Sequence, residues 1–267
     1  MAKLLPGILF TGTLGNLSAY TMRGSDKIIV RHKGGPSKEQ IKTHPHFDLT
    51  RRYNAEFGGR ASTSSEIMRI VYPHKALGDF NLAPALNKLL VTVQHWDTES
   101  DLGRRNVCLS RNPQILEGFD LNKKNIFSSI IRSPLNYSLS RSSDEASINI
   151  PALLPGINFF VPDKFPFFSI IVTVGVVPDM IYSDTFKKYK PSVKFPTSHI
   201  FHEASTLWMP CINGSEATTL KVTIQNLPPG NNWSLAMAIG IRFANVNTEG
   251  KPQQAKYAGA AKILAMR

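Results

Sequence analysis

Apolar side chains occupy every second position from Trp233 to Phe243, near the C-terminal end of the chain. The members of this series are Trp233, Leu235, Met237, Ile239, Ile241 and Phe243. A period of two places them all on one face of a β-strand. The residues between them are mostly small and neutral, which indicates close packing on the other face too. We therefore predict a long strand at 232–244, with a second layer or a neighbouring subunit against its second face.

Strand patterns continue through the C-terminal half of the chain, from Gly118 onward. Alternating apolar residues on both sides of the Ser142–Glu145 turn predict a hairpin. The nearly continuous apolar run at 167–177 is typical of a strand that is covered on both faces. The remaining segments are expected to be strands at 199–209, 220–224 and 255–266 and a surface loop at 187–196. Together these patterns predict an antiparallel β-sandwich over residues 118–267.

The N-terminal residues 8–31 carry the pattern of a β-hairpin. Gly12 and Gly15 are followed by an apolar segment, a Gly24–Asp26 turn and a second apolar segment. Turn residues between two apolar runs favour antiparallel pairing. Gly12 and Gly15 are best explained as positions that need unusual backbone angles or a close approach of another backbone.

Helix signals follow the hairpin. Ser37 with Gln40 three residues later forms a capping-box pattern, which predicts one or two helical turns ending near Thr43. Longer helices are expected at 48–72, beginning at Asp48, and at 83–96, with Asn81 as its cap. The chain is therefore predicted to be an α+β protein: a basic region of hairpin and helices at residues 1–117, then the β-sandwich at 118–267.

The predicted 48–72 helix has an apolar stripe and a basic face. The stripe is expected to include Leu49, Tyr53, Phe57, Ala61, Ile67, Met68 and Val71. Four arginines leave it, namely Arg51, Arg52, Arg60 and Arg69. Such a face binds polyanions by neutralising phosphates, although the same pattern also describes the solvated side of an ordinary helix. Gly58–Gly59 in the middle indicates a kink or a close contact.

The charge of the whole chain agrees with a polyanionic partner. Its 267 residues include 31 Lys and Arg against 19 Asp and Glu, so the formal net charge is +12. A net charge of this size favours binding to nucleic acid, an anionic polymer or an acidic protein surface. No apolar run is long enough for a membrane span. We expect a cytoplasmic protein, or one that is exported without a recognisable N-terminal signal.

The sequence contains no recognisable catalytic or metal-binding motif. His44 and His46, and His199 and His202, form pairs without the further ligands that a structural zinc site needs. The two cysteines, Cys108 and Cys211, are expected to be free thiols, and no serine lies in a nucleophile-elbow motif. We therefore expect neither a metal nor a cofactor, and no enzymatic activity.

Several segments resemble an uncharacterised protein family that recurs in Bacteroidota genomes. These segments are Gly12–Asn16, Tyr20–Arg31, Asn54–Gly59, Asn81–Leu86, Ile150–Phe160, Gly175–Asp179 and Lys256–Leu264. The likeness extends over nearly the whole chain and implies no activity. A shorter Bacteroidota family of unknown function is similar only over the glycine hairpin and the following Arg-rich helix.

These patterns lead to a hypothesis of self-assembly. The N-terminal hairpin contains no proline from Ile8 to Arg31, so nothing in it prevents another chain from pairing with its edges. The expected assembly residues are Gly12, Gly15, Leu17, Tyr20, Ile28 and Val30. We predict a structural protein that forms homo-oligomers or docks into a larger particle. The alternatives are a sequence-nonspecific nucleic-acid-binding protein that uses the Arg-rich helix, and a hairpin that only packs on its own chain.

Overall fold

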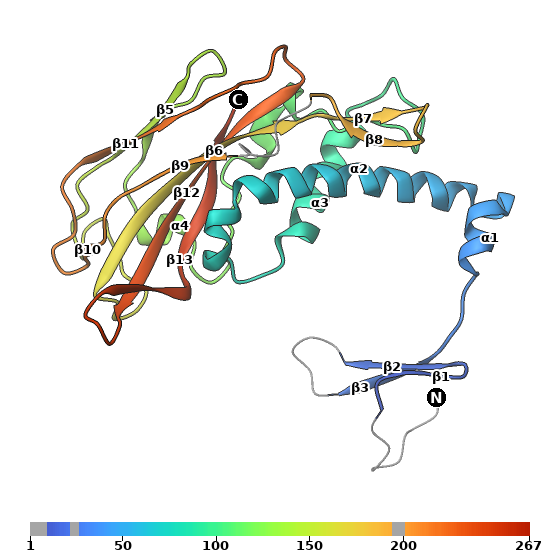
Figure 1. Ribbon diagram of the computed structural model, residues 1–267, viewed down its shortest axis with the longest axis horizontal. Helices are drawn as coiled ribbons and strands as arrows, with labels where there is room; N and C mark the ends of the chain where they lie inside the picture. Colours follow the sequence, from blue (N-terminus) through green and yellow to red (C-terminus); the bar gives the residue numbers. More distant parts are fainter. Residues whose placement is uncertain (1–9, 22–26, 194–200) are drawn as a thin grey trace. The chain divides into compact units, whose positions relative to one another are not determined.

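The computed structural model describes residues 10–21, 27–193 and 201–267 (Figure 1). The chain divides by its contacts into two compact units, Met1–Arg51 and Arg52–Arg267. The second unit therefore includes residues on both sides of the boundary expected at residue 117. The protein is α+β, as predicted, with a small N-terminal sheet and helices followed by several antiparallel sheets.

The first unit contains a three-stranded antiparallel sheet in the order β1–β2–β3. Its strands are β1 (Gly12–Leu14), β2 (Leu17–Thr21) and β3 (Ile28–His32). The turn expected at Gly24–Asp26 lies outside the described residues. Helix α1 (Lys38–Thr43) follows, and both bonds of the predicted Ser37–Gln40 capping box are present. A 3₁₀ turn at Pro45–Phe47 leads into the next helix.

Two longer helices begin at the predicted residues. Helix α2 (Asp48–Ile70) starts at Asp48, and α3 (Leu82–His95) has Asn81 as its N-cap, whose side chain accepts a hydrogen bond from the Ala83 N–H. A 3₁₀ segment at Tyr72–Leu77 connects them. Shorter helical turns follow at Leu109–Arg111, at Pro113–Leu116 and in α4 (Phe127–Ile130).

The core of the second unit is built on a five-stranded antiparallel sheet. Its long strands are β6 (Phe167–Pro178), β12 (Trp233–Val246) and β13 (Pro252–Met266). The short strands β9 (Phe201–Ser205) and β10 (Met209–Pro210) both pair with β6. This confirms the predictions of a long strand at 232–244, a doubly covered strand at 167–177 and a closing strand at the C-terminus.

A second sheet packs against one face of the first. It has the order β11–β5–β4, with β4 at Asn136–Ser138, β5 at Glu145–Ile150 and β11 at Thr218–Thr223. The apolar series from Trp233 to Phe243 points into the core between the two sheets, together with Ile148 and Val222. This is the arrangement of two facing sheets that the alternation predicts.

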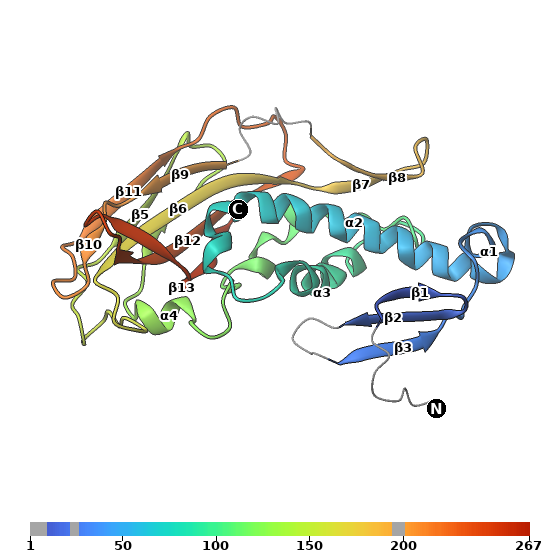
Figure 2. The ribbon, with the colours of Figure 1, turned by 60° about the horizontal axis from the view of Figure 1, so that its bottom comes forward.

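Helices cover the opposite face of β6, β12 and β13 (Figure 2). Ala236 and Ala238 of β12 belong to a second core, which they share with Ile67 and Ile70 of α2 and Leu90 of α3. Small side chains on this face of β12 let the helical layer approach closely. Of the two alternatives for the second face of this strand, the structure therefore has a second layer of the same chain.

The loop predicted at 187–196 is wrong in its first part. Strand β8 (Lys188–Pro191) pairs with β7 (Met180–Ser183) in an antiparallel hairpin. Tyr182 and Tyr189 face each other across this pair in an edge-to-face contact. The aromatic packing that makes this segment a strand involves residues outside it, so the basic composition at 187–196 gave no sign of it.

Candidate functional site

The N-terminal sheet has one apolar and one polar face. Residues paired across antiparallel strands point to the same side, and side chains alternate along each strand. The strand registers therefore place five apolar residues on one side: Leu14, Leu17, Ala19, Ile28 and Val30. We call this surface the apolar face. The other side carries Thr13, Ser18, Tyr20, Ile29 and Arg31, with the Arg31 guanidinium 5.6 Å from the centre of the Tyr20 ring.

The apolar face is largely open. Leu14 is 65% exposed and Leu17 is 39% exposed. Ala19 is the only buried side chain among residues 10–21 and 27–51, the described part of the first unit. A sheet of this size needs its hydrophobic face packed against another element to be stable. The first unit thus has an apolar surface and almost no core of its own.

The six residues expected to mediate assembly lie at three kinds of position. Leu17, Ile28 and Val30 are on the apolar face, and Gly12 pairs with Ala19 on the same side. Tyr20 lies on the polar face. Gly12 and Gly15 have φ angles of 114° and 55°, in the left-handed range that favours glycine. The structure therefore brings the aliphatic members of the set together and separates Tyr20 from them.

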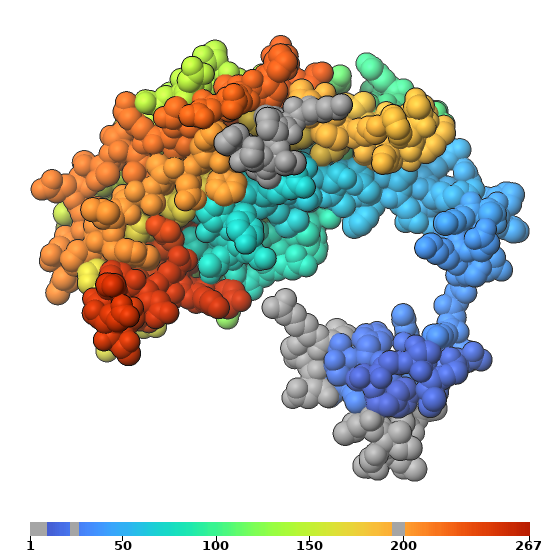
Figure 3. All heavy atoms as spheres, viewed as in Figure 1, coloured from blue at the N-terminus to red at the C-terminus, as the bar shows by residue number. Residues whose placement is uncertain are grey.

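A second exposed apolar surface lies on α2. Leu49, Tyr53 and Phe57 follow one another at four-residue spacing and are 51–55% exposed. We call these three residues the α2 stripe. The expectation that they are buried is wrong, whereas Ile67 and Val71, further along the predicted stripe, are buried. Side chains of α2, coloured blue to cyan, form part of the surface in Figure 3.

The four arginines of α2 do not form a single basic face. Arg51 and Arg60 are nine residues apart, which places them on opposite sides of a helix. Arg51 donates to the carbonyl oxygens of Ile41 and His44, and Arg60 donates to Oε1 of Gln94. Arg69 forms an ion pair of 2.9 Å with Glu66. Arg52 is exposed.

A buried ion pair holds α2 to the chain that follows α3. Glu56 is 1% exposed, and its two carboxylate oxygens accept from Nε and one terminal nitrogen of Arg105 at 2.6 and 2.7 Å. The Gly103 N–H donates to the same carboxylate at 2.9 Å. Burial raises the pKa of Glu56, but these hydrogen bonds outweigh it, and the net pKa is lowered.

Gln94 extends this buried network. Its amide nitrogen donates to the carbonyl oxygen of Arg105 at 2.7 Å, which also accepts from the Tyr189 hydroxyl at 2.9 Å. The Tyr189 ring lies against Gly59, so the glycine pair of α2 marks a close contact, one of the two alternatives predicted. Sequence reasoning missed this network. The small residues at Gly59 and Thr63, three and seven positions after Glu56, were the available sign of a buried polar face.

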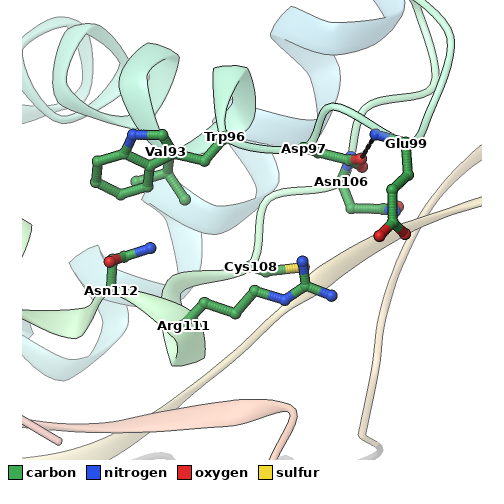
Figure 4. A pocket seen from close by; sticks show the side chains of 8 residues that line it. All are labelled: Val93, Trp96, Asp97, Glu99, Asn106, Cys108, Arg111 and Asn112. Carbon is green, nitrogen blue, oxygen red and sulfur yellow. Dashed lines mark hydrogen bonds between the residues drawn. The ribbon is translucent and has the colours of Figure 1, made fainter.

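A small pocket lies beside the end of α3 (Figure 4). It is lined by Val93, Trp96, Asp97, Glu99, Asn106, Cys108, Arg111 and Asn112. Its volume is about 40 Å³, which is room for a few water molecules. The Asp97 carboxylate is engaged by the backbone N–H groups of Glu99, Ser100 and Asn106. The pocket is therefore mainly a structured turn.

The thiol in this pocket is not activated. Burial, with a smaller effect of the Asp179 carboxylate, raises the pKa of Cys108 to about 11. Burial raises the pKa of the second free cysteine, Cys211, to about 11 as well. Both are therefore neutral thiols at physiological pH, whereas the thiolate is the nucleophilic form.

Histidine and acidic side chains do not gather at a metal-like site in the part of the chain described. No three His, Cys, Asp or Glu residues in that part are placed to hold a metal ion. His44 and His46 lie near each other with their rings edge to face, and His199 lies outside the described residues. No described helix is long and apolar enough to cross a membrane.

Comparisons with protein-family models, curated proteins and solved structures found no match to this chain. The resemblance to a Bacteroidota family stays a prediction. The argument about function must therefore come from the two exposed apolar surfaces and from the completeness of the second unit.

Proposed function

We propose that this protein is a structural subunit that self-assembles and has no catalytic activity. In this proposal the N-terminal sheet is an assembly element, and the second unit is the body that it connects. The observation that carries the proposal is the contrast between the units. The second unit has two hydrophobic cores, while Ala19 is the single buried side chain in the described part of the first.

The physical reason is the instability of an uncovered sheet. A three-stranded sheet is stabilised mainly by burying its hydrophobic face, and each fully buried Leu, Ile or Val contributes about 1.5–3 kcal/mol. Leu14 and Leu17 make little of this contribution while they are exposed. Packing against another copy would supply it. The same sheet also has a five-residue outer strand, β3, without proline, which is suitable for edge pairing.

Substitutions on the two faces of β2 test this function. Leu17→Asp places a charge on the apolar face, and Ser18→Asp places the same charge on the opposite face one residue away. We expect the wild-type protein and Ser18→Asp to form oligomers in size-exclusion chromatography with light scattering. Leu17→Asp is expected to elute as a monomer with unchanged circular dichroism from the body. A wild-type protein that is monomeric up to high concentration would reject the proposal.

Sequence-nonspecific nucleic-acid binding is the alternative, and the net charge of +12 favours it. Its test is a salt titration with duplex and single-stranded DNA. Binding through phosphates must weaken steeply as the salt concentration rises. Absence of binding at low salt would reject this alternative.

A further inference from the structure

The chain carries two exposed apolar surfaces of complementary kinds. One is the apolar face of the N-terminal sheet, and the other is the α2 stripe. A helix packed on a sheet is one of the standard ways in which such surfaces are buried. Resting on the proposed self-assembly, we infer that the apolar face of one copy docks on the α2 stripe of a second copy.

The two surfaces match in length. Strands β2 and β3 have five residues each, and four steps of about 3.3 Å span about 13 Å. The stripe runs over eight residues from Leu49 to Phe57, which is about 12 Å along a helix. The large side chains of Tyr53 and Phe57 would lie over the small central side chain of Ala19, between the flanking Leu17 and Val30.

The size of the contact indicates a reciprocal exchange. A face of about 13 Å by two or three strand spacings covers roughly 200 Å², so one contact buries roughly 400 Å² over both partners. This is well below the roughly 1,200 Å² of a stable interface. A two-fold arrangement in which each copy gives its sheet and receives its partner's sheet uses both surfaces and doubles the area. We therefore expect weak, concentration-dependent association.

Charge adds a distinctive salt dependence. Lys27 and Arg31 lie on β3 or just before it, and Arg52 and Arg60 flank the stripe on α2. Like charges on both surfaces repel, and salt screens that repulsion. Association through these surfaces should strengthen as salt rises, whereas copies held together by bound nucleic acid should separate.

The test uses two full-length double variants, each with one damaged surface. The sheet variant is Leu17→Asp with Val30→Asp, and the stripe variant is Tyr53→Glu with Phe57→Glu. Neither should self-associate in sedimentation velocity. A mixture restores one intact contact, so fluorescently labelled stripe variant should show a rise in anisotropy with the sheet variant and none with itself. We expect this affinity to be at least tenfold weaker than that of the wild type.

Asn54→Glu is the matched control, because Asn54 is an exposed residue of α2 beside the stripe. It should assemble like the wild type. A stripe variant that assembles as well as the wild type overturns this inference and leaves the proposed function standing. A wild-type monomer overturns the proposed function itself. Oligomers that nuclease treatment dissolves would show that nucleic acid holds the copies together, and would also overturn the inference.

Discussion

Gly240 of β12 lies directly against His74 of the 3₁₀ segment between α2 and α3. A Cβ atom on Gly240 would be 2.5 Å from Nδ1 of His74 and 2.9 Å from a methyl carbon of Leu77. The sheet and the helical layer thus meet where β12 has no side chain. Gly240→Ala is expected to destabilise the protein by about 1–3 kcal/mol, because the helices must move outward. An unchanged urea midpoint would contradict this packing.

The glycine pair of α2 offers a matched comparison. A Cβ on Gly58 meets nothing within 4 Å, whereas a Cβ on Gly59 would lie 2.8 Å from the Tyr189 ring. Gly58→Ala should therefore stabilise the protein by about 0.5–1 kcal/mol through helix propensity. Gly59→Ala should destabilise it, since the ring has to shift. Thermal melts of the two variants should move in opposite directions, and a shift in the same direction would refute the difference in environment.

His74 makes stability depend on pH. Burial, with a smaller effect of Arg242, lowers the pKa of His74 from 6.5 to about 3. Between these values the unfolded chain binds more protons at this position, so the free energy of unfolding falls as the pH is lowered from 6.5. The loss is at most about 1.4 kcal/mol per pH unit.

Urea unfolding of the wild type and His74→Gln at pH 6.5 and 4.5 isolates this effect. Carboxyl groups contribute to both proteins alike, so the difference between the two pH dependences reports His74. We expect the wild type to lose about 2–3 kcal/mol more than the variant over this range. Equal losses would mean that His74 is not held neutral in the folded protein.

The Glu56–Arg105 pair should be essential for the stability of the second unit. Glu56→Gln removes the negative charge and leaves Arg105 and the neighbouring Arg60 partly buried without it. Breaking a buried pair in this way costs about 3–5 kcal/mol. Arg69→Ala breaks the exposed pair with Glu66 and should cost less than about 1 kcal/mol. Urea denaturation of both variants measures the contrast, and similar losses would argue against a structural role of the buried network.

Local chemistry explains which elements were predictable. The Ser37–Gln40 box and the Asn81 cap depend on neighbouring residues, and the structure contains both. The period of two around Ile239 reports a strand whatever its partners are. The small residues of β12 also indicated that a second layer packs there, although they did not say of what kind.

Other features depend on contacts between distant parts of the chain. Four-residue spacing grouped Leu49, Tyr53 and Phe57 on one side of a helix, but spacing cannot tell how far the core extends along it. Glu56 and Arg105 are 49 residues apart, and the sequence between them does not indicate their pairing. The buried environment of Arg60 follows from that pair and from Gln94. The sequence therefore misassigned Leu49, Tyr53 and Phe57 to the core and missed the buried network.

Sedimentation velocity of the wild-type protein, over a range of concentrations at low and high salt, tests self-assembly most directly. The monomer mass is 29.6 kDa. The account predicts a mass that rises above this value with concentration and rises further at high salt, with Leu17→Asp remaining at the monomer mass. A wild-type protein that stays at 29.6 kDa under all these conditions would contradict it.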